Sequence, residues 1–269
     1  IVGGLRGNEY QQLYICSKLI DVLKKIEKHG DIVGENGILV IPSVSNMSMD
    51  FGKRFWISDD TDLNRLFPGN PSGESGSRVA YAIMETTKGY RYGIHLPSFY
   101  LGGTFMPHIR LLDPEHGSTS LANLFGLPYV IEAKSRPFDR TTLHNNWQRN
   151  GTEAFSLYTG MTGKIDDELA AQAVSSILRF LTRMGIIRYY SHSGYIASVL
   201  KEGDLEPIMT EAAGIFIKKA ECGQEVSRGD VLAQIMKADS GEIISEVKAP
   251  TDGIIFYAET RPVVYSNLL

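Results

Sequence analysis

The first nine residues bring an arginine and a carboxylate to the start of a helix. Residues 1–9 read IVGGLRGNE, an apolar run that ends in paired glycines and a polar turn. From Tyr10 onward apolar residues recur at helical spacing, which predicts a strand, a turn and an amphipathic helix. In open α/β sheets ligands bind beyond the carboxyl ends of strands, and Arg6 and Glu9 fall at such a position. The turn alone is weak support, because its glycines equally suit an ordinary loop.

A second group of polar residues could bind an anion. Arg54 precedes the segment DLNRLFPG, residues 62–69, which contains Asn64 and Arg65. A planar guanidinium holds a carboxylate by two parallel hydrogen bonds, which a lysine ammonium cannot reproduce. The two arginines therefore predict a carboxylate-binding site. The alternative is that both lie on the surface and pair with the local aspartates, Asp59, Asp60 and Asp62.

These two motifs together resemble one known family. Residues 4–9, GLRGNE, are similar to the opening Gly-x-His-Gly-x-Glu of the succinylglutamate desuccinylase/aspartoacylase family, which is related to the zinc carboxypeptidases. Residues 62–69 match that family's Asp-Leu-Asn-Arg-x-Phe-Pro-Gly segment. The resemblance implies a hydrolase that removes the acyl group from N-acyl amino acids, cleaving an amide bond in a small carboxylate substrate.

The resemblance also implies a zinc site in which one ligand is replaced. In the family, the His and the Glu of the opening motif are two of three zinc ligands. Here Glu9 is retained, but Arg6 stands where the family has the His. His95 matches the third ligand, although Gly93 replaces the aspartate of the family's Asp-x-His pattern, a residue that orients the metal-side chemistry. Glu9 and His95 are therefore the metal-ligand candidates.

On the substrate side, the resemblance assigns roles to four residues. Arg54 matches an arginine that polarises the scissile carbonyl, and Asn64 and Arg65 match residues that bind the substrate carboxylate. The family's general base is a Glu on a strand, and Tyr158 occupies that position here. A phenol has a pKa of about 10, so Tyr158 is a poor base at neutral pH unless that pKa is strongly shifted. Tyr158 and Arg54 are the catalytic candidates.

Arg6 determines how this site should differ from the family's. A guanidinium has no free lone pair with which to ligate zinc, and its fixed charge repels a dication. We therefore expect zinc to be disfavoured. Our hypothesis is that Arg6 occupies the position of the ion and pairs with Glu9. Arg6, Arg54 and Arg65 would then form a positive cavity suited to a small dicarboxylate or an N-acyl amino acid.

The sequence permits three interpretations of the activity. The first is an active metallohydrolase with a rebuilt site, which recruits His108 or His144. The second is a metal-free enzyme that uses Arg6 as the electrophile and Tyr158 as the acid or base. The third is a non-catalytic protein that binds small carboxylates on the hydrolase scaffold.

Composition excludes several other classes of protein. The chain has 269 residues, a net charge of −4, a pI of about 5.9 and no block of basic residues, so nucleic acid is not an expected partner. No apolar run approaches the length of a membrane span. The only two cysteines, Cys16 and Cys222, exclude a disulfide framework and suit the reducing cytoplasm. The sequence leaves homo-oligomer formation open, and because residue 1 is not Met we expect further residues upstream.

The order of patterns predicts an α/β fold with a mixed, largely parallel sheet flanked by helices, carboxypeptidase-like, over residues 1–190. Residues 191–269 show only short strands separated by turns, and they resemble a biotinyl/lipoyl-like barrel-sandwich appendage. Lys237 there is expected to be an ordinary surface lysine, so no biotin or lipoate is expected. Predicted helices begin at Tyr10, after a Ser77 cap, at residue 119 and at Asp166 or Asp167; predicted strands cover residues 38–41, 90–97, 127–133 and 154–159.

Overall fold

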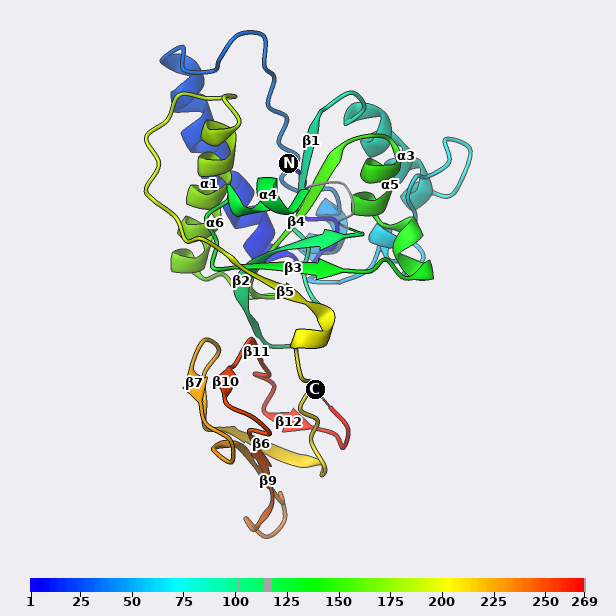
Figure 1. The fold of residues 1–269 in the computed structure, drawn as a ribbon. Helices are drawn as coiled ribbons and strands as arrows, with labels where there is room; N and C mark the ends of the chain where they lie inside the picture. The colour runs from blue at the N-terminus through cyan, green and yellow to red at the C-terminus, as the bar shows by residue number, and fades with distance from the viewer. Residues whose placement is uncertain (101, 114–117, 269) are drawn as a thin grey trace. The chain divides into compact units, whose positions relative to one another are not determined.

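The structure is a computed structural model that describes residues 1–100, 102–113 and 118–268. The chain forms two compact units (Figure 1). Unit 1 comprises Ile1–Ser98 and Pro107–Glu202, and unit 2 comprises Phe99–Met106 and Gly203–Leu269. The division into domains at residues 1–190 and 191–269 stays a prediction.

The main sheet has the strand order β1-β4-β2-β3-β5, and the pairs β1–β4, β2–β3 and β3–β5 are parallel. The short strand β11 pairs antiparallel with the beginning of β2, within unit 2. Beside β1, Val2 forms parallel bridges to both His95 and Ile41. The predicted mixed, largely parallel sheet is therefore confirmed. The strands are β1 (Tyr92–His95), β2 (Thr104–Leu112), β3 (Tyr129–Ala133), β4 (Glu153–Met161), β5 (Ser198–Lys201) and β11 (Tyr257–Ala258).

Helices cover both faces of this sheet (Figure 1). The long helices α1 (Tyr10–Lys28) and α6 (Asp167–Arg183) pack together and share one apolar core with the strands. A second core forms around α3 (Ser75–Thr86) and α5 (Leu143–Arg149). The remaining helical segments are α2 (Asn46–Asp50), η1 (Leu63–Arg65), α4 (Ser118–Asn123), η2 (Pro137–Thr141) and η3 (Glu202–Asp204).

The alternation of side chains along the strands determines which residues face the site. On β4, Phe155 and Leu157 belong to the core beneath α1 and α6, whereas Ala154 belongs to the core around α5. Because successive side chains of a strand point to opposite faces, Ser156 and Tyr158 lie on the α5 face. His95 is the register partner of Ser156 on β1, so it belongs to the same polar face.

The helices that begin at Tyr10 and near Asp166 are confirmed, and the Asp166 side chain caps α6 by accepting from the Leu169 amide at 3.0 Å. The predicted Ser77 cap is wrong: α3 begins at Ser75 and its N-cap residue is Glu74. The predicted buried strand at residues 38–41 is also wrong, because only Ile41 forms a bridge and all four residues are half-buried. Strand β2 and helix α5 were missed.

Unit 2 is rich in β-structure, as predicted. A four-stranded sheet in the order β12-β6-β8-β9 is antiparallel throughout, and β7 pairs antiparallel with β10. Lys237 lies in the turn between β8 and β9, and its ammonium is 3.4 Å from Asp239. The strands are β6 (Gly214–Lys218), β7 (Glu225–Val226), β8 (Val231–Met236), β9 (Ile243–Lys248), β10 (Gly253–Ile254) and β12 (Val263–Val264).

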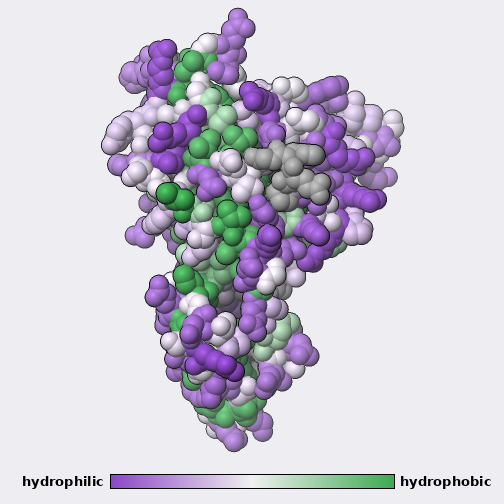
Figure 2. All heavy atoms as spheres, in the orientation of Figure 1, coloured by the Kyte–Doolittle hydropathy of each residue, from purple (hydrophilic) through white to green (hydrophobic). Residues whose placement is uncertain are grey.

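The surface is mainly polar in the view of Figure 2, with smaller hydrophobic groups between the hydrophilic residues. Among the helices that the structure describes, none is both long and apolar enough to cross a bilayer.

We expect Gly93→Ala to lower the free energy of unfolding by about 1–3 kcal/mol, the usual effect of an added methyl group in a packed interior. The new Cβ would lie 2.5 Å from Cε3 of Trp147, whose ring is buried and whose Nε1 donates to Thr87 Oγ1 at 2.9 Å. Urea denaturation followed by circular dichroism measures the effect. Gly203→Ala is the matched control, because a Cβ there meets nothing within 4 Å. Equal stability of the two variants would contradict this packing.

Candidate functional site

The turn that carries Arg6 is held tightly against its neighbours. Gly4 has a φ of 53°, a conformation that glycine adopts without strain. A Cβ on Gly7 would lie 2.3 Å from backbone atoms of both Ser48 and Lys53, so only glycine fits there. Glu9 is the N-cap residue of α1, but its side chain makes no cap hydrogen bond. It points back towards the turn instead.

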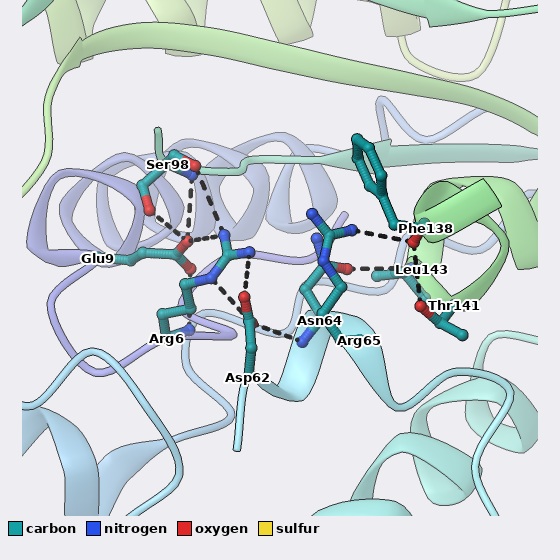
Figure 3. A network of polar contacts seen from close by, with 9 residues as sticks. All are labelled: Arg6, Glu9, Asp62, Asn64, Arg65, Ser98, Phe138, Thr141 and Leu143. Atoms are coloured by element: carbon teal, nitrogen blue, oxygen red, sulfur yellow. Dashed lines mark hydrogen bonds and ion pairs between the residues drawn. The ribbon is translucent and has the colours of Figure 1, made fainter. Parts of the chain in front are cut away.

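The Arg6 guanidinium is buried between two carboxylates (Figure 3). Its Nε and Nη2 donate to the two oxygens of Asp62 at 3.0 and 2.9 Å, which is a bidentate pair. Its Nη1 donates to Glu9 Oε1 at 3.2 Å and to the Ser98 carbonyl at 3.5 Å. The expected pair between Arg6 and Glu9 is therefore present, together with an Asp62 partner that was not expected.

Glu9 is fully buried, and both of its carboxylate oxygens are occupied by hydrogen bonds. Oε1 accepts from the Ser98 amide at 3.1 Å and from Ser98 Oγ at 2.7 Å, in addition to Arg6 Nη1. Oε2 accepts from the Arg6 amide at 3.0 Å. These bonds compensate for the removal of the charge from water.

Burial and ion pairing act in opposite directions on this cluster. For Asp62, burial raises the pKa, but the hydrogen bonds and charge of Arg6 outweigh it and hold the pKa below its usual value. For Arg6, burial lowers the pKa, and the charges of Glu9 and Asp62 reverse this and raise the pKa overall. Arg6 and Asp62 are therefore both ionised at neutral pH.

The predicted carboxylate-binding segment adjoins this cluster. Asp62 accepts from the Asn64 amide at 3.1 Å, and Asn64 Oδ1 accepts from the Leu143 amide at 3.0 Å, at the start of α5. Arg65 is exposed, donates to the Phe138 carbonyl at 3.4 Å and lies over the Phe138 ring at 5.1 Å. The segment thus joins the Arg6 turn to α5.

Arg54 lies close enough to this cluster to interact electrostatically with Arg6, Asp62 and Glu9. Its carbonyl accepts from the Gly7 amide at 3.3 Å, and its guanidinium lies 5.8 Å from the centre of the Phe55 ring. Burial lowers the pKa of Arg54, the charge of Arg6 lowers it further, and the two carboxylates, Asp62 and Glu9, oppose this. The two cations, Arg54 and Arg6, therefore both interact with the same pair of carboxylates, Glu9 and Asp62.

His95 lies at the end of β1, fully inside the protein, and its Nε2 has no hydrogen-bond partner among the described residues. Burial lowers the pKa of His95 well below its usual value, and the charge of Arg6 adds to the effect, so the ring is neutral. The place of the missing aspartate at Gly93 is filled by Trp147, which leaves no room for a side chain there.

Tyr158 does not have the properties of a general base. Its ring stacks on His108 from β2, with centroids 5.1 Å apart and planes 4° from parallel. Burial raises the pKa of Tyr158, and this outweighs the opposing charges of Arg110 and Arg6. The phenol therefore stays protonated at neutral pH and can donate a proton, but it does not accept one readily.

His144 belongs to the same polar face but is engaged elsewhere. Its Nδ1 is 2.8 Å from Ser156 Oγ, and within the part of the chain that the structure describes its Nε2 has no hydrogen-bond partner. Burial lowers the pKa of His144 to about 3, and the charge of Arg110 contributes. Like His95, it is a neutral imidazole at neutral pH.

The residues at this position do not fit the zinc ion that the family resemblance implies. Three protein ligands with available lone pairs are needed. Of the three matched positions, Arg6 offers none, and Glu9 has both oxygens committed to hydrogen bonds. His95 is the one of these three with a ring nitrogen that no described group uses. Within the described part of the chain, no three His, Cys, Asp or Glu side chains are grouped so as to hold a metal.

The sequence motifs predicted that Arg6, Glu9, His95, Arg54 and the 62–69 segment lie in one region, and the contacts and charges described above connect them. The role of Asp62 was missed: the alternative interpretation paired this residue with Arg54 or Arg65, whereas it pairs with Arg6. The roles of Ser98 and Trp147 were missed as well. A signal existed for Asp62, because it begins the matched motif; nothing in the sequence singled out the other two.

Comparison with known proteins agrees with the family that the two sequence motifs resemble. A sequence profile of the succinylglutamate desuccinylase/aspartoacylase catalytic domain matches residues 1–184. The N-alpha-acetyl-L-2,4-diaminobutyric acid deacetylase of Halomonas elongata is similar, with 24% identity over 95% of this chain and 75% of its own length.

Solved structures share the fold. A succinylglutamate desuccinylase from a Silicibacter species superposes with a TM-score of 0.83 at 19% identity, covering 99% of this chain and 81% of that one. The product-bound ectoine utilization protein EutE from Ruegeria pomeroyi gives 0.81 at 19% identity, covering 99% and 82%. Because the catalytic-domain profile matches well over half of the sequence, the chain belongs to the succinylglutamate desuccinylase/aspartoacylase family.

Proposed function

We propose that this protein binds small carboxylates of the N-acyl amino acid class, at a site that works without zinc. Membership of a deacylase family and similarity to a deacetylase of an N-acetylated amino acid support the ligand class. The unpaired Cys16 and Cys222 support a reducing compartment, which we take to be the cytoplasm.

A single observation carries the proposal. The Arg6 guanidinium is held by Glu9 and Asp62, so a permanent cation stands beside the two family metal-ligand positions that this chain retains. In this proposal Arg65 and Arg54 bind the ligand carboxylate, with Asn64 fixing the segment that carries Arg65. The exposed position of Arg65 supports this role, because a ligand can reach its guanidinium without displacing a buried ion pair.

The second candidate is a metal-free deacylase in which Arg6 and Arg54 polarise the acyl carbonyl and Tyr158 supplies a proton. The raised pKa of Tyr158 favours a donor role. Amide hydrolysis also needs a group that accepts a proton from the attacking water, and Glu9 is fully occupied by hydrogen bonds. We therefore favour a binding function over a hydrolytic one. Release of acetate from N-acetyl amino acids in the presence of a chelator would favour the enzyme.

We expect N-acetylglycine, N-acetyl-L-glutamate or N-succinyl-L-glutamate to raise the melting temperature, equally with and without EDTA. Arg65→Lys should weaken binding about tenfold, which corresponds to one charge-assisted hydrogen bond. Isothermal titration calorimetry measures the affinity. Arg149→Lys, on an exposed arginine at the end of α5, is the matched control and should bind like the wild type. Failure of all three acids to bind at millimolar concentration would refute the proposed function.

We expect the wild type, equilibrated with Zn²⁺ and then desalted, to retain far less than one zinc ion per chain. Arg6→His should retain zinc at close to one per chain, because it adds an imidazole and frees the Glu9 carboxylate from its bond to the guanidinium. Elemental analysis by mass spectrometry measures the metal. Arg188→His, at an exposed site, should retain none. Stoichiometric zinc in the wild type that is lost in Glu9→Gln would show that Glu9 holds a zinc ion and would contradict this prediction.

A further inference from the structure

The Arg6 guanidinium has one N–H group that no part of the described structure accepts. A guanidinium carries five N–H donors. One on Nε, one on Nη2 and two on Nη1 are used, by Asp62, Glu9 and Ser98. The second hydrogen of Nη2 remains. The side chain is 95% buried, and a buried donor without an acceptor costs free energy.

The direction of this N–H is fixed by the bonds around it. Asp62 holds the edge formed by Nε and Nη2, and Glu9 and Ser98 hold Nη1 (Figure 3). The guanidinium is planar, so its remaining hydrogen points away from Asp62, in the plane of the group. Donors that are fixed in advance stabilise a ligand oxygen without having to reorganise.

The local charge determines which ligand atom this donor suits. Arg6, Glu9 and Asp62 together carry one positive and two negative charges, a net charge of −1. A ligand carboxylate next to this cluster would be repelled, and Arg54 and Arg65 offer it a better position. A neutral amide carbonyl has no such penalty, and its oxygen accepts hydrogen bonds.

We propose that the free Nη2–H of Arg6 binds the acyl carbonyl oxygen of the ligand, while Arg54 and Arg65 hold its carboxylate. This inference rests on the proposed function and deepens it. The family resemblance assigns the acyl carbonyl to Arg54; the geometry assigns it to Arg6. The protein would thus distinguish N-acyl acids from simple carboxylic acids by one buried donor.

The test compares N-acetylglycine with pentanoate, which has the same chain length but two methylene groups in place of the amide. Calorimetry gives a Kd for each acid, and the quantity compared is the ratio of the two. Arg6→Lys keeps a cation between Glu9 and Asp62 but loses the planar donor. We expect the preference for N-acetylglycine to fall about tenfold in Arg6→Lys, with the Kd of pentanoate changed less than twofold. Arg188→Lys should leave both Kd values unchanged, and Arg65→Lys should weaken both acids alike.

Each outcome distinguishes the two proposals. If neither acid binds to the wild type, the proposed function fails. If both bind and Arg6→Lys leaves the ratio unchanged, this inference fails while carboxylate binding stands.

A second measurement covers the case in which Arg6→Lys does not fold. In wild-type protein with ¹⁵N-labelled arginine, the Nη resonances of Arg6 should move on addition of N-acetylglycine and stay in place with pentanoate. Equal shifts with both acids, or none with either while calorimetry shows binding, would overturn the assignment.

Discussion

A buried guanidinium between two carboxylates organises this site. Arg6 connects the turn before α1 to the Asp62 segment and, through Ser98, to the chain that leaves β1. A buried ion pair is stable only when the desolvation of its charges is compensated by good geometry and further hydrogen bonds. Every oxygen of Glu9 and Asp62 has at least one donor here. The cluster therefore fixes three segments that are distant in sequence.

This arrangement changes the electrostatics that the family scaffold normally provides. A metal dication can bind and leave, and it lowers the pKa of bound water. A guanidinium is permanent, carries a single charge and offers only donors. The buried histidines are neutral and Tyr158 is a proton donor. The described polar face therefore contains several groups that can hold a ligand oxygen and none that readily takes a proton from water.

Sequence patterns predicted the elements whose signals are local. The apolar periodicity of α1 and α6 and the Asp166 cap are examples, as is the proximity of Arg6 to Glu9, which lie in one turn. The Arg6–Asp62 pair spans 56 positions, and other aspartates competed for the role. Strand β2 was missed because it contains Pro107 in its interior, and a proline there argues against a strand. Helix α5 was missed because it is short and rich in Asn.

The indole of Trp147 restricts which side chains position 93 can carry. It occupies the space beside Gly93, where an aspartate would support His95 in the family pattern. A mutation at position 6 alone could supply a new metal ligand, but His95 would remain without a side chain that orients its ring. Recovering that partner would first require a smaller residue at 147, at the expense of the core around α5. The side chain at position 147 therefore sets how many coordinated changes separate this site from the pattern of its family.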